Sequence, residues 1–179
     1  MGRWEPDAEG RFRAAAMELF VERGYEQTTV AGIAERAGLT ARTFFRYFAD
    51  KRAVLFNGGE RLQQTMVSAL STAPAHASAI EAIGAALGAA GDFFIENREF
   101  ARQRSSVIAA TAELRERELI KLATLSDALA EGLRSRAITE PEASLAAEAG
   151  IAVFRVAFGL WVAGSGQRSF SEIVSESLA

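Results

Sequence analysis

A short run of basic and hydroxyl side chains between residues 36 and 52 is the clearest candidate for a functional site in this sequence. Ile33, Leu39 and Phe44 have the spacing of the apolar contacts in a helix-turn-helix, and Gly38 suits the left-handed backbone of its tight turn. The second helix then has a free outer face, which carries Thr40, Arg42, Thr43 and Arg46. Lys51 and Arg52 follow this helix in the sequence. Five basic residues against one acid give residues 36–52 a local charge of +4. A projecting basic helix of this kind suits the major groove of DNA.

Composition restricts the other chemistry that is available. The 179 residues carry 20 Lys and Arg against 23 Asp and Glu, a net charge of −3, so any nucleic-acid surface must be local. The chain has no Cys and a single His, His76, which excludes disulfides and thiol nucleophiles and leaves little material for a metal site or a catalytic triad. We therefore expect no cofactor, no metal site and no enzymatic activity.

No secretory signal or membrane span is predicted. Residues 1–7 are not a basic start followed by an apolar segment. The longest apolar stretch, residues 150–164, contains Arg155 and is shorter than the roughly 20 residues that a bilayer span needs. We expect a cytoplasmic protein with no membrane partner.

Apolar residues recur at spacings of three and four throughout, and no alternating strand pattern appears, so the fold class is predicted to be all-α with about nine helices. Gly24 ends the first helix, and Thr28 or Thr29, Thr40 and Asp50 are caps for the next three. The expected helical ranges are 7–23, 30–37, 41–48, 51–70, 76–97, 99–110, 113–137, 141–163 and 169–178.

The segment 11–56 resembles the DNA-binding head of the TetR/AcrR (tetracycline-repressor-like) transcriptional regulators. The matching stretches are AAAMELFVERGYEQTTV, IAERAGLTARTFFRYF and the following DK, in the order and spacing of that family's first helix, helix-turn-helix and start of helix four. The resemblance implies a three-helix DNA-binding domain over residues 1–56. Through helix four it is joined to a helical ligand-binding and dimerisation bundle over residues 57–179.

The resemblance also implies roles for single residues. Thr29 and Lys51 would meet phosphates at helix starts, and the residues at or near DNA would be Thr40, Arg42, Thr43, Arg46 and Tyr47. Arg42 stands where many members carry Gly, and it can pair with a guanine edge or neutralise a phosphate. Phe45 stands where many carry Tyr, so a phenol contact to phosphate is not expected. We expect Phe45 to pack within the head, with an exposed Phe45 as the alternative.

The range 141–163 is apolar on more than one face. One side carries Ile151, Phe154, Phe158 and Trp161, and another carries Val153, Val156, Ala157 and Leu160. One face can serve the core and the other a partner, so we expect a homodimer. The candidate interface residues are Ile151, Phe154, Phe158 and Trp161. The alternative is a helix buried centrally in a monomer.

The middle helices carry phenylalanines interleaved with Arg98, Arg102 and Arg104, which suggests an apolar pocket with a cationic rim. The candidate ligand-binding residues are Met66, Phe93, Phe94, Phe100, Arg104 and Ile108. The alternative is that the phenylalanines are core residues and the arginines are solvated.

Together these features predict a ligand-responsive transcriptional regulator, most simply a repressor. It would bind an inverted-repeat, double-stranded DNA operator as a homodimer and be released by a small, largely apolar effector. One alternative is a helical small-molecule-binding protein or an enzyme that uses Glu113 or Arg104 and does not use its head for DNA. Another is an adaptor whose head binds a protein.

Overall fold

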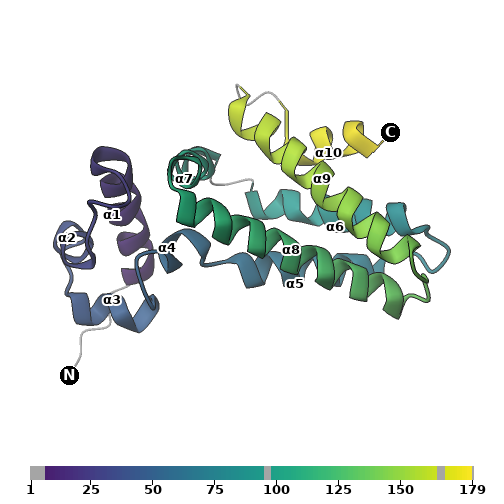
Figure 1. The fold of residues 1–179 in the computed structure, drawn as a ribbon, viewed down its shortest axis with the longest axis horizontal. Coiled ribbons are helices and arrows are strands. Elements are labelled where there is room, and N and C mark those ends of the chain that lie inside the picture. Colours follow the sequence, from purple (N-terminus) through teal and green to yellow (C-terminus); the bar gives the residue numbers. More distant parts are fainter. Residues whose placement is uncertain (1–6, 95–97, 165–167, 179) are drawn as a thin grey trace. The chain divides into compact units, whose positions relative to one another are not determined.

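A computed structural model of the protein describes residues 7–94, 98–164 and 168–178, with only the helical backbone of Phe93 and Phe94. All regular secondary structure in these residues is helical, which confirms the all-α prediction (Figure 1). The helices are α1 (Ala8–Arg23), α2 (Val30–Arg36), α3 (Ala41–Tyr47), α4 (Ala53–Phe56), α5 (Gly59–Thr72), α6 (Ala79–Phe94), α7 (Arg98–Ala110), α8 (Ala112–Ser135), α9 (Glu142–Ala163) and α10 (Phe170–Leu178).

The ends of the first three helices follow from the predicted capping residues. Gly24 ends α1 with a φ of 83°, and Gly38 turns the chain between α2 and α3 with a φ of 65°. Thr29 and Thr40 each accept a hydrogen bond from the backbone N–H three residues later, which satisfies a donor that the helix leaves free. These turns fix the direction in which α3 projects.

The prediction of a single helix over residues 51–70 is wrong, because the helix is interrupted at Gly58. Gly58 has a φ of 97° and separates the short α4 from α5. A left-handed residue cannot continue an α-helix, and glycine adopts this conformation at low cost. The predicted cap at Asp50 is present, since its carboxylate accepts a hydrogen bond from Ala53 N–H at 2.8 Å.

The chain forms two compact units. The first contains Met1–Asn57 together with Gln103–Arg115, and the second contains Gly58–Arg102 with Glu116–Ala179. The segment Gln103–Arg115 was not expected in the first unit. Both α7 and α8 therefore contribute residues to both units.

The helices α1, α2 and α3 of the first unit pack against one another (Figure 1), and their side chains form an aromatic core. Phe12 and Phe44 are completely buried, with ring centroids 5.2 Å apart and nearly perpendicular planes. Ile33 and Phe48 are buried beside them. Edge-to-face packing of this kind orients α3 rigidly against α1.

The second unit is a helical bundle in which α6 packs against α5, α9 and α10 (Figure 1). Its core includes Met66 and Leu70 of α5, Ile83 and Leu87 of α6, and Leu129 of α8. By length and composition α9 is also apolar enough to cross a membrane. One face of α9 is occupied by the core of this unit, and 39% of its apolar window is buried.

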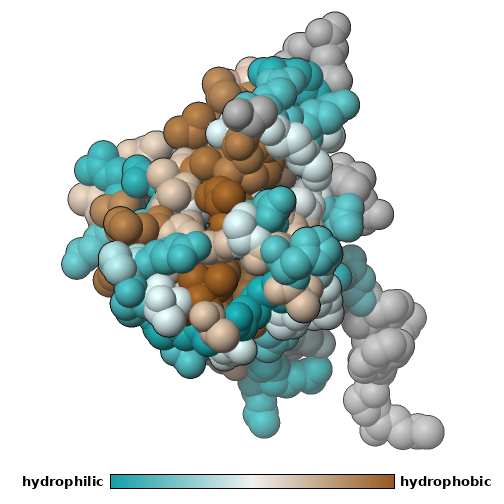
Figure 2. All heavy atoms as spheres, turned by 90° about the vertical axis from the view of Figure 1, so that its right-hand side faces the viewer, coloured by the Kyte–Doolittle hydropathy of each residue, from teal (hydrophilic) through white to brown (hydrophobic). Residues whose placement is uncertain are grey.

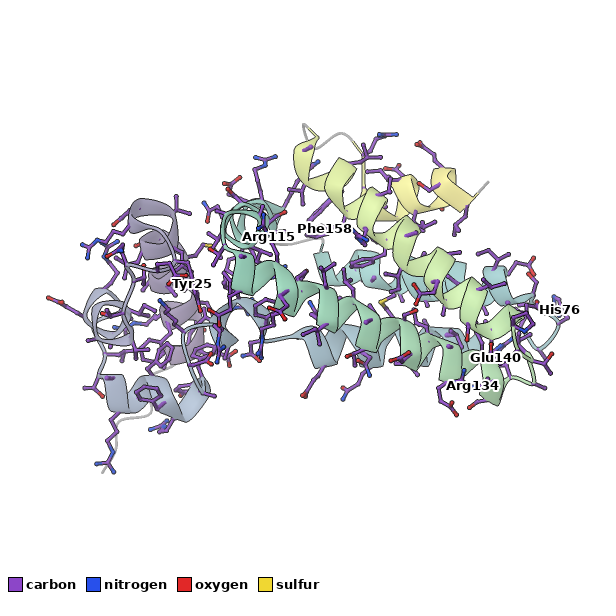
Figure 3. The ribbon with its side chains drawn as sticks, viewed as in Figure 1. Tyr25, His76, Arg115, Arg134, Glu140 and Phe158 are labelled. Atoms are coloured by element: carbon purple, nitrogen blue, oxygen red, sulfur yellow. The ribbon has the colours of Figure 1, made fainter. Side chains whose placement is uncertain are left out.

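The residues predicted as a dimer interface lie instead in the core of their own unit. Ile151, Phe154 and Trp161 are only 5–7% exposed, and Phe158 packs against the same cluster with its ring stacked on Phe154 at 6.1 Å. Figure 3 shows Phe158 on the side of α9 that faces the other helices of this unit. The assignment of the two apolar faces of α9 is therefore corrected, because the aromatic face fills the core.

The opposite face of α9 carries exposed apolar residues, which we call the outer stripe. The stripe consists of Leu145, Ala149, Ala152, Val156 and Leu160. Leu145, Val156 and Leu160 are 50–65% exposed, and α8 separately exposes Leu119 and Ile120. Large apolar side chains that stand exposed on one face of a helix are typical of an interaction surface.

Candidate nucleic-acid interface

The outer face of α3 carries three exposed side chains at helical spacing, Arg42, Phe45 and Arg46. They stand at i, i+3 and i+4, so they share one face. Phe45 is 58% exposed, and its ring makes an edge-to-face contact with the Phe44 ring, with centroids 5.6 Å apart. The expectation that Phe45 packs within the head is therefore wrong, because Phe12, Phe44 and Phe48 already fill that core.

The two arginines of this face remain available for a ligand. Arg42 forms no hydrogen bond or ion pair with any residue in the described part of the chain. Arg46 donates to the Tyr47 hydroxyl at 3.3 Å, and its guanidinium lies 5.4 Å from the centre of that ring. Neither interaction neutralises a charge, so α3 presents two positive groups side by side.

Arg36 and Arg52, counted in the predicted +4 cluster, are paired with acids. Arg36 contacts Glu18 and Glu22 of α1 at 3.0 and 2.9 Å, and its hydrogen bond holds the pKa of Glu22 below the usual value. Arg52 contacts Asp50 and Glu113 at 2.6 Å each. Because these pairs hold α2 to α1 and the start of α8 to the start of α4, the basic patch is confined to the α3 face.

Lys51 has a different environment from the one expected of a phosphate contact. Its ammonium donates to the backbone carbonyls of Tyr25, Thr28 and Glu26 at 2.8, 3.0 and 3.4 Å. An ammonium has three N–H donors, so these acceptors occupy all of them. The side chain of Lys51 therefore fixes the loop between α1 and α2. A contact of this ammonium with a DNA phosphate stays a prediction.

Tyr25 completes this anchor. The Lys51 ammonium lies 4.2 Å from the centre of the Tyr25 ring, a cation–π geometry. Tyr25 is 5% exposed and lies inside the first unit (Figure 3). Burial, with the nearby Glu113 carboxylate second, raises the pKa of Tyr25 to about 12, so the phenol stays neutral at ordinary pH.

A second basic side chain holds the turn of the helix-turn-helix. Arg11 of α1 donates to the carbonyl oxygens of Ala37 and Gly38 at 2.5 and 3.5 Å. A Cβ on Gly38 would lie 3.0 Å from the same guanidinium, in addition to the unfavourable φ. This role of Arg11 was missed, because a contact across 26 residues leaves no local pattern in the sequence.

The hydroxyl groups predicted near DNA lie at the starts of α2 and α3. Thr29 and Thr40 are exposed N-caps, and the Thr40 and Thr43 hydroxyls are 2.9 Å apart. Helix starts present unpaired backbone N–H groups together with these hydroxyls, which suits phosphate oxygens. Tyr47 is half-buried and packs 6.3 Å from the Phe12 ring.

The predicted ligand-binding residues do not share one environment. Met66 is completely buried in the second unit, Phe100 is half-buried, and Ile108 is buried in the first unit. Arg104 donates to the Leu55 carbonyl at 2.6 Å within the first unit. The side chains of Phe93 and Phe94 lie outside the described residues.

The prediction that Arg98 and Arg102 form the cationic rim of a pocket is also corrected. Arg98 donates to the Trp161 carbonyl, and Arg102 donates to those of Val162 and Gly164 at 3.1 and 3.3 Å. These α7 arginines interact with carbonyls at the C-terminal end of α9, where positive charge is favourable. They act as helix caps in this structure.

An open depression of about 490 Å³ lies between the starts of α6 and α9 in the second unit. It is lined mainly by apolar atoms, from Ser78, Ala79, Ile80, Pro141, Glu142, Leu145 and Ala146. Figure 2 views this end of the unit and shows apolar atoms near the centre of the surface with polar atoms around them. The depression contains none of the predicted ligand-binding residues.

Comparison with known families gives two matches. Residues 12–57 match the family described as bacterial regulatory proteins, tetR family. Residues 77–179 match the MftR C-terminal domain.

Curated relatives match over part of their length. The chain is 39% identical over 74 residues to the HTH-type transcriptional regulator TcmR of Streptomyces glaucescens, covering 41% of this chain and 33% of TcmR. It is 32% identical over 99 residues to the putative mycofactocin biosynthesis transcriptional regulator MftR of Mycobacterium tuberculosis, covering 55% of this chain and 50% of MftR. The chain thus spans between a third and a half of the length of these relatives.

Solved structures share the fold over nearly the whole chain. The fatty acid degradation regulator FadR of Bacillus halodurans superposes with a TM-score of 0.68 at 18% identity, over 98% of this chain and 95% of that one. FadR of Bacillus subtilis, solved in complex with stearoyl-CoA, gives a TM-score of 0.62 at 23% identity, over 94% and 95%. FadR of Thermus thermophilus, solved with lauroyl-CoA, gives 0.58 at 22% identity, over 95% and 91%.

Proposed function

Since the chain belongs to the tetR family of bacterial regulatory proteins, we propose that it is a cytoplasmic, ligand-responsive transcriptional repressor. It binds an inverted-repeat operator as a homodimer and is released by a small, largely apolar effector. The observation that carries this proposal is the outer face of α3, where Arg42 and Arg46 are exposed without an acidic partner in the described part of the chain.

In the proposed complex α3 lies in the major groove. Arg42 and Arg46 face base edges or phosphates, and the hydroxyls of Thr29, Thr40 and Thr43 stand at helix starts that suit phosphate oxygens. Tyr47 lies beside Arg46 at the rim of this surface. Lys51 contributes indirectly, by holding the loop that leads into α2.

The proposed dimer uses the outer stripe of α9 together with Leu119 and Ile120 of α8. The support is physical: these residues leave large apolar side chains in water in the isolated chain. The small Ala149 and Ala152 of the stripe allow a partner helix to approach closely. A two-fold dimer presents two α3 helices, as an inverted-repeat operator requires.

The proposed release is a population shift. An effector that binds better to a conformation with wrongly spaced heads lowers the fraction of dimers that match the operator. Glu113 near the start of α8 is paired with Arg52, and Arg104 of α7 donates to the Leu55 carbonyl. Because α7 and α8 supply residues to both units, movements of these helices reach α4 directly.

The enzyme alternative based on Glu113 or Arg104 is not favoured by any contact. Glu113 Oε1 accepts a hydrogen bond from Arg52 at 2.6 Å, and Arg104 Nε donates to a backbone carbonyl. Both groups therefore already have structural partners.

Selection from a random-sequence duplex library with the purified protein tests the proposal. We expect enrichment of one inverted repeat with half-sites about one helical turn apart, or a multiple of it. A library that returns no enriched sequence at physiological salt contradicts the proposed function. An enriched sequence that lacks inverted-repeat symmetry contradicts only the proposal that the protein binds as a homodimer.

We expect acyl compounds to stabilise the protein in a thermal-shift screen and to weaken operator binding. The screen would contain lauroyl-CoA, stearoyl-CoA and laurate, because the fold neighbours were solved with acyl-CoA, and coenzyme A alone is the control. At a ligand concentration of 100 times Kd, binding to the folded state adds about 2.7 kcal/mol of stability. Compounds that stabilise the protein but leave its DNA affinity unchanged would contradict an effector role.

Lys51→Met is expected to lower the free energy of unfolding by about 1 to 3 kcal/mol, because three carbonyls lose a charged donor. Urea titration measures this loss. Lys121→Met is the matched control, since Lys121 is the only other lysine in the sequence. The slope of log affinity against log salt should be unchanged in Lys51→Met. A slope lower by about one unit would show that the ammonium contacts a phosphate after all.

A further inference from the structure

Phe45 is the one large apolar side chain on the outer face of α3. It is 58% exposed, while Phe44 and Phe48 on the same helix and at its end are at most 2% exposed. A single exposed apolar residue is ordinary on a protein surface. Its place matters here, because Arg42 precedes it by three residues and Arg46 follows it directly.

The chemistry of Phe45 limits what it can contact in the proposed complex. A phenyl ring has no hydrogen-bond donor or acceptor, so it cannot bind a phosphate oxygen or a polar base edge. It can lose water only against another apolar group. In the major groove the exposed apolar group is the 5-methyl group of thymine.

We propose that Phe45 is a specificity-determining residue that packs against the 5-methyl group of one thymine in each half-site. This inference rests on the proposed function and deepens it. The two arginines attract the polyanion and set the register, while Phe45 distinguishes thymine from cytosine, which lacks the methyl group. The charges beside Phe45 favour DNA over an apolar protein partner, because Arg42 and Arg46 would both be desolvated in an apolar interface.

The rigid support of the ring favours a specific contact. Phe45 lies 5.6 Å from Phe44 at an interplanar angle of 88°, and Phe44 is locked against Phe12 in the core. The edge of a buried ring therefore holds one side of Phe45, while the other side faces outward. A pre-positioned ring loses little conformational freedom on binding.

Deoxyuridine scanning of the selected operator tests this contact. Deoxyuridine pairs as thymine does and lacks only the 5-methyl group. Each thymine is replaced singly, and affinities are measured for the full-length protein and for Phe45→Ala. Val21→Ala is the matched control, because Val21 is an exposed apolar residue of α1 at 57% exposure. Phe45→Ser, checked by thermal melting, guards against an effect peculiar to alanine.

We expect one thymine per half-site whose replacement weakens binding by the wild-type protein and by Val21→Ala about 3- to 5-fold, as the loss of one buried methyl group predicts. The same replacement should have no further effect on Phe45→Ala or Phe45→Ser. Equal sensitivity in the Phe45 variants would overturn the inference, because another residue would read the methyl group. A uniform weakening of the variants with no sensitive thymine would also overturn it, and would indicate packing on the sugar backbone.

The two proposals fail in different ways. If selection enriches no sequence, the proposed function is overturned and the thymine contact with it. If selection enriches an operator that shows no Phe45-dependent thymine, only the thymine contact is overturned.

Discussion

Val156→Asp is expected to turn the proposed homodimer into a monomer and to weaken operator binding about 100-fold or more. Val156 is 58% exposed in the middle of the outer stripe, so the change does not disturb the core of its own unit. At a two-fold interface the change would bury a carboxylate from each subunit, and an unpaired charge is costly to bury. A monomer contacts one half-site, and its affinity would approach the nonspecific range of roughly 10⁻⁴ to 10⁻⁶ M.

Sedimentation at micromolar concentration and operator titration measure the two effects together. The wild-type protein should sediment at twice the chain mass of 19.2 kDa. Val21→Asp is the matched control, because Val21 has nearly the same exposure, at 57%, but lies on α1. A Val156→Asp protein that remains dimeric would show that α9 does not form the interface through its outer stripe.

Arg42→Ala is expected to cost about 1 to 3 kcal/mol in operator binding and to relax the choice of one base pair per half-site. The physical reason is that Arg42 is exposed on α3 and has no partner in the described part of the chain, so its guanidinium is available for a bidentate pair with guanine. Nonspecific binding should fall much less. Titration of operator variants at a fixed salt concentration measures the change.

Arg23→Ala is the matched control, because it removes the same charge from the exposed last turn of α1, and it should leave the base preference unchanged. Suppose that Arg42→Ala weakens all operator variants equally and lowers the salt slope by about one unit. Arg42 would then be a phosphate contact, and base reading would pass to Thr40, Thr43, Arg46 or Tyr47.

Local signals were sufficient to predict most of the helices. Residues that cap or end a helix, such as Thr29, Thr40 and Gly24, act on neighbours within one helical turn, so the sequence alone predicts their effect. The break at Gly58 was missed because glycine also occurs inside helices. Only its φ of 97° shows that the helix cannot continue.

The parts that could not be predicted depend on contacts between distant residues. Both faces of α9 are apolar, so periodicity alone could not tell that Phe154 and Trp161 enter the core while Val156 and Leu160 remain exposed. The same limit applies to Lys51, whose long side chain reaches the Tyr25 carbonyl 26 residues away. Local charge also overstated the basic patch, because the pairing of Arg36 with Glu22 bridges two helices.

Methylation protection on the selected operator tests the central claim most directly. Dimethyl sulfate modifies guanine N7, which lies in the major groove, and adenine N3, which lies in the minor groove. If two α3 helices of a dimer occupy successive major grooves, the bound protein should protect guanine N7 at symmetric positions in both half-sites and leave the adenines between them reactive. Protection confined to adenine N3, or to one half-site at saturating protein, would contradict a dimer that reads DNA through α3.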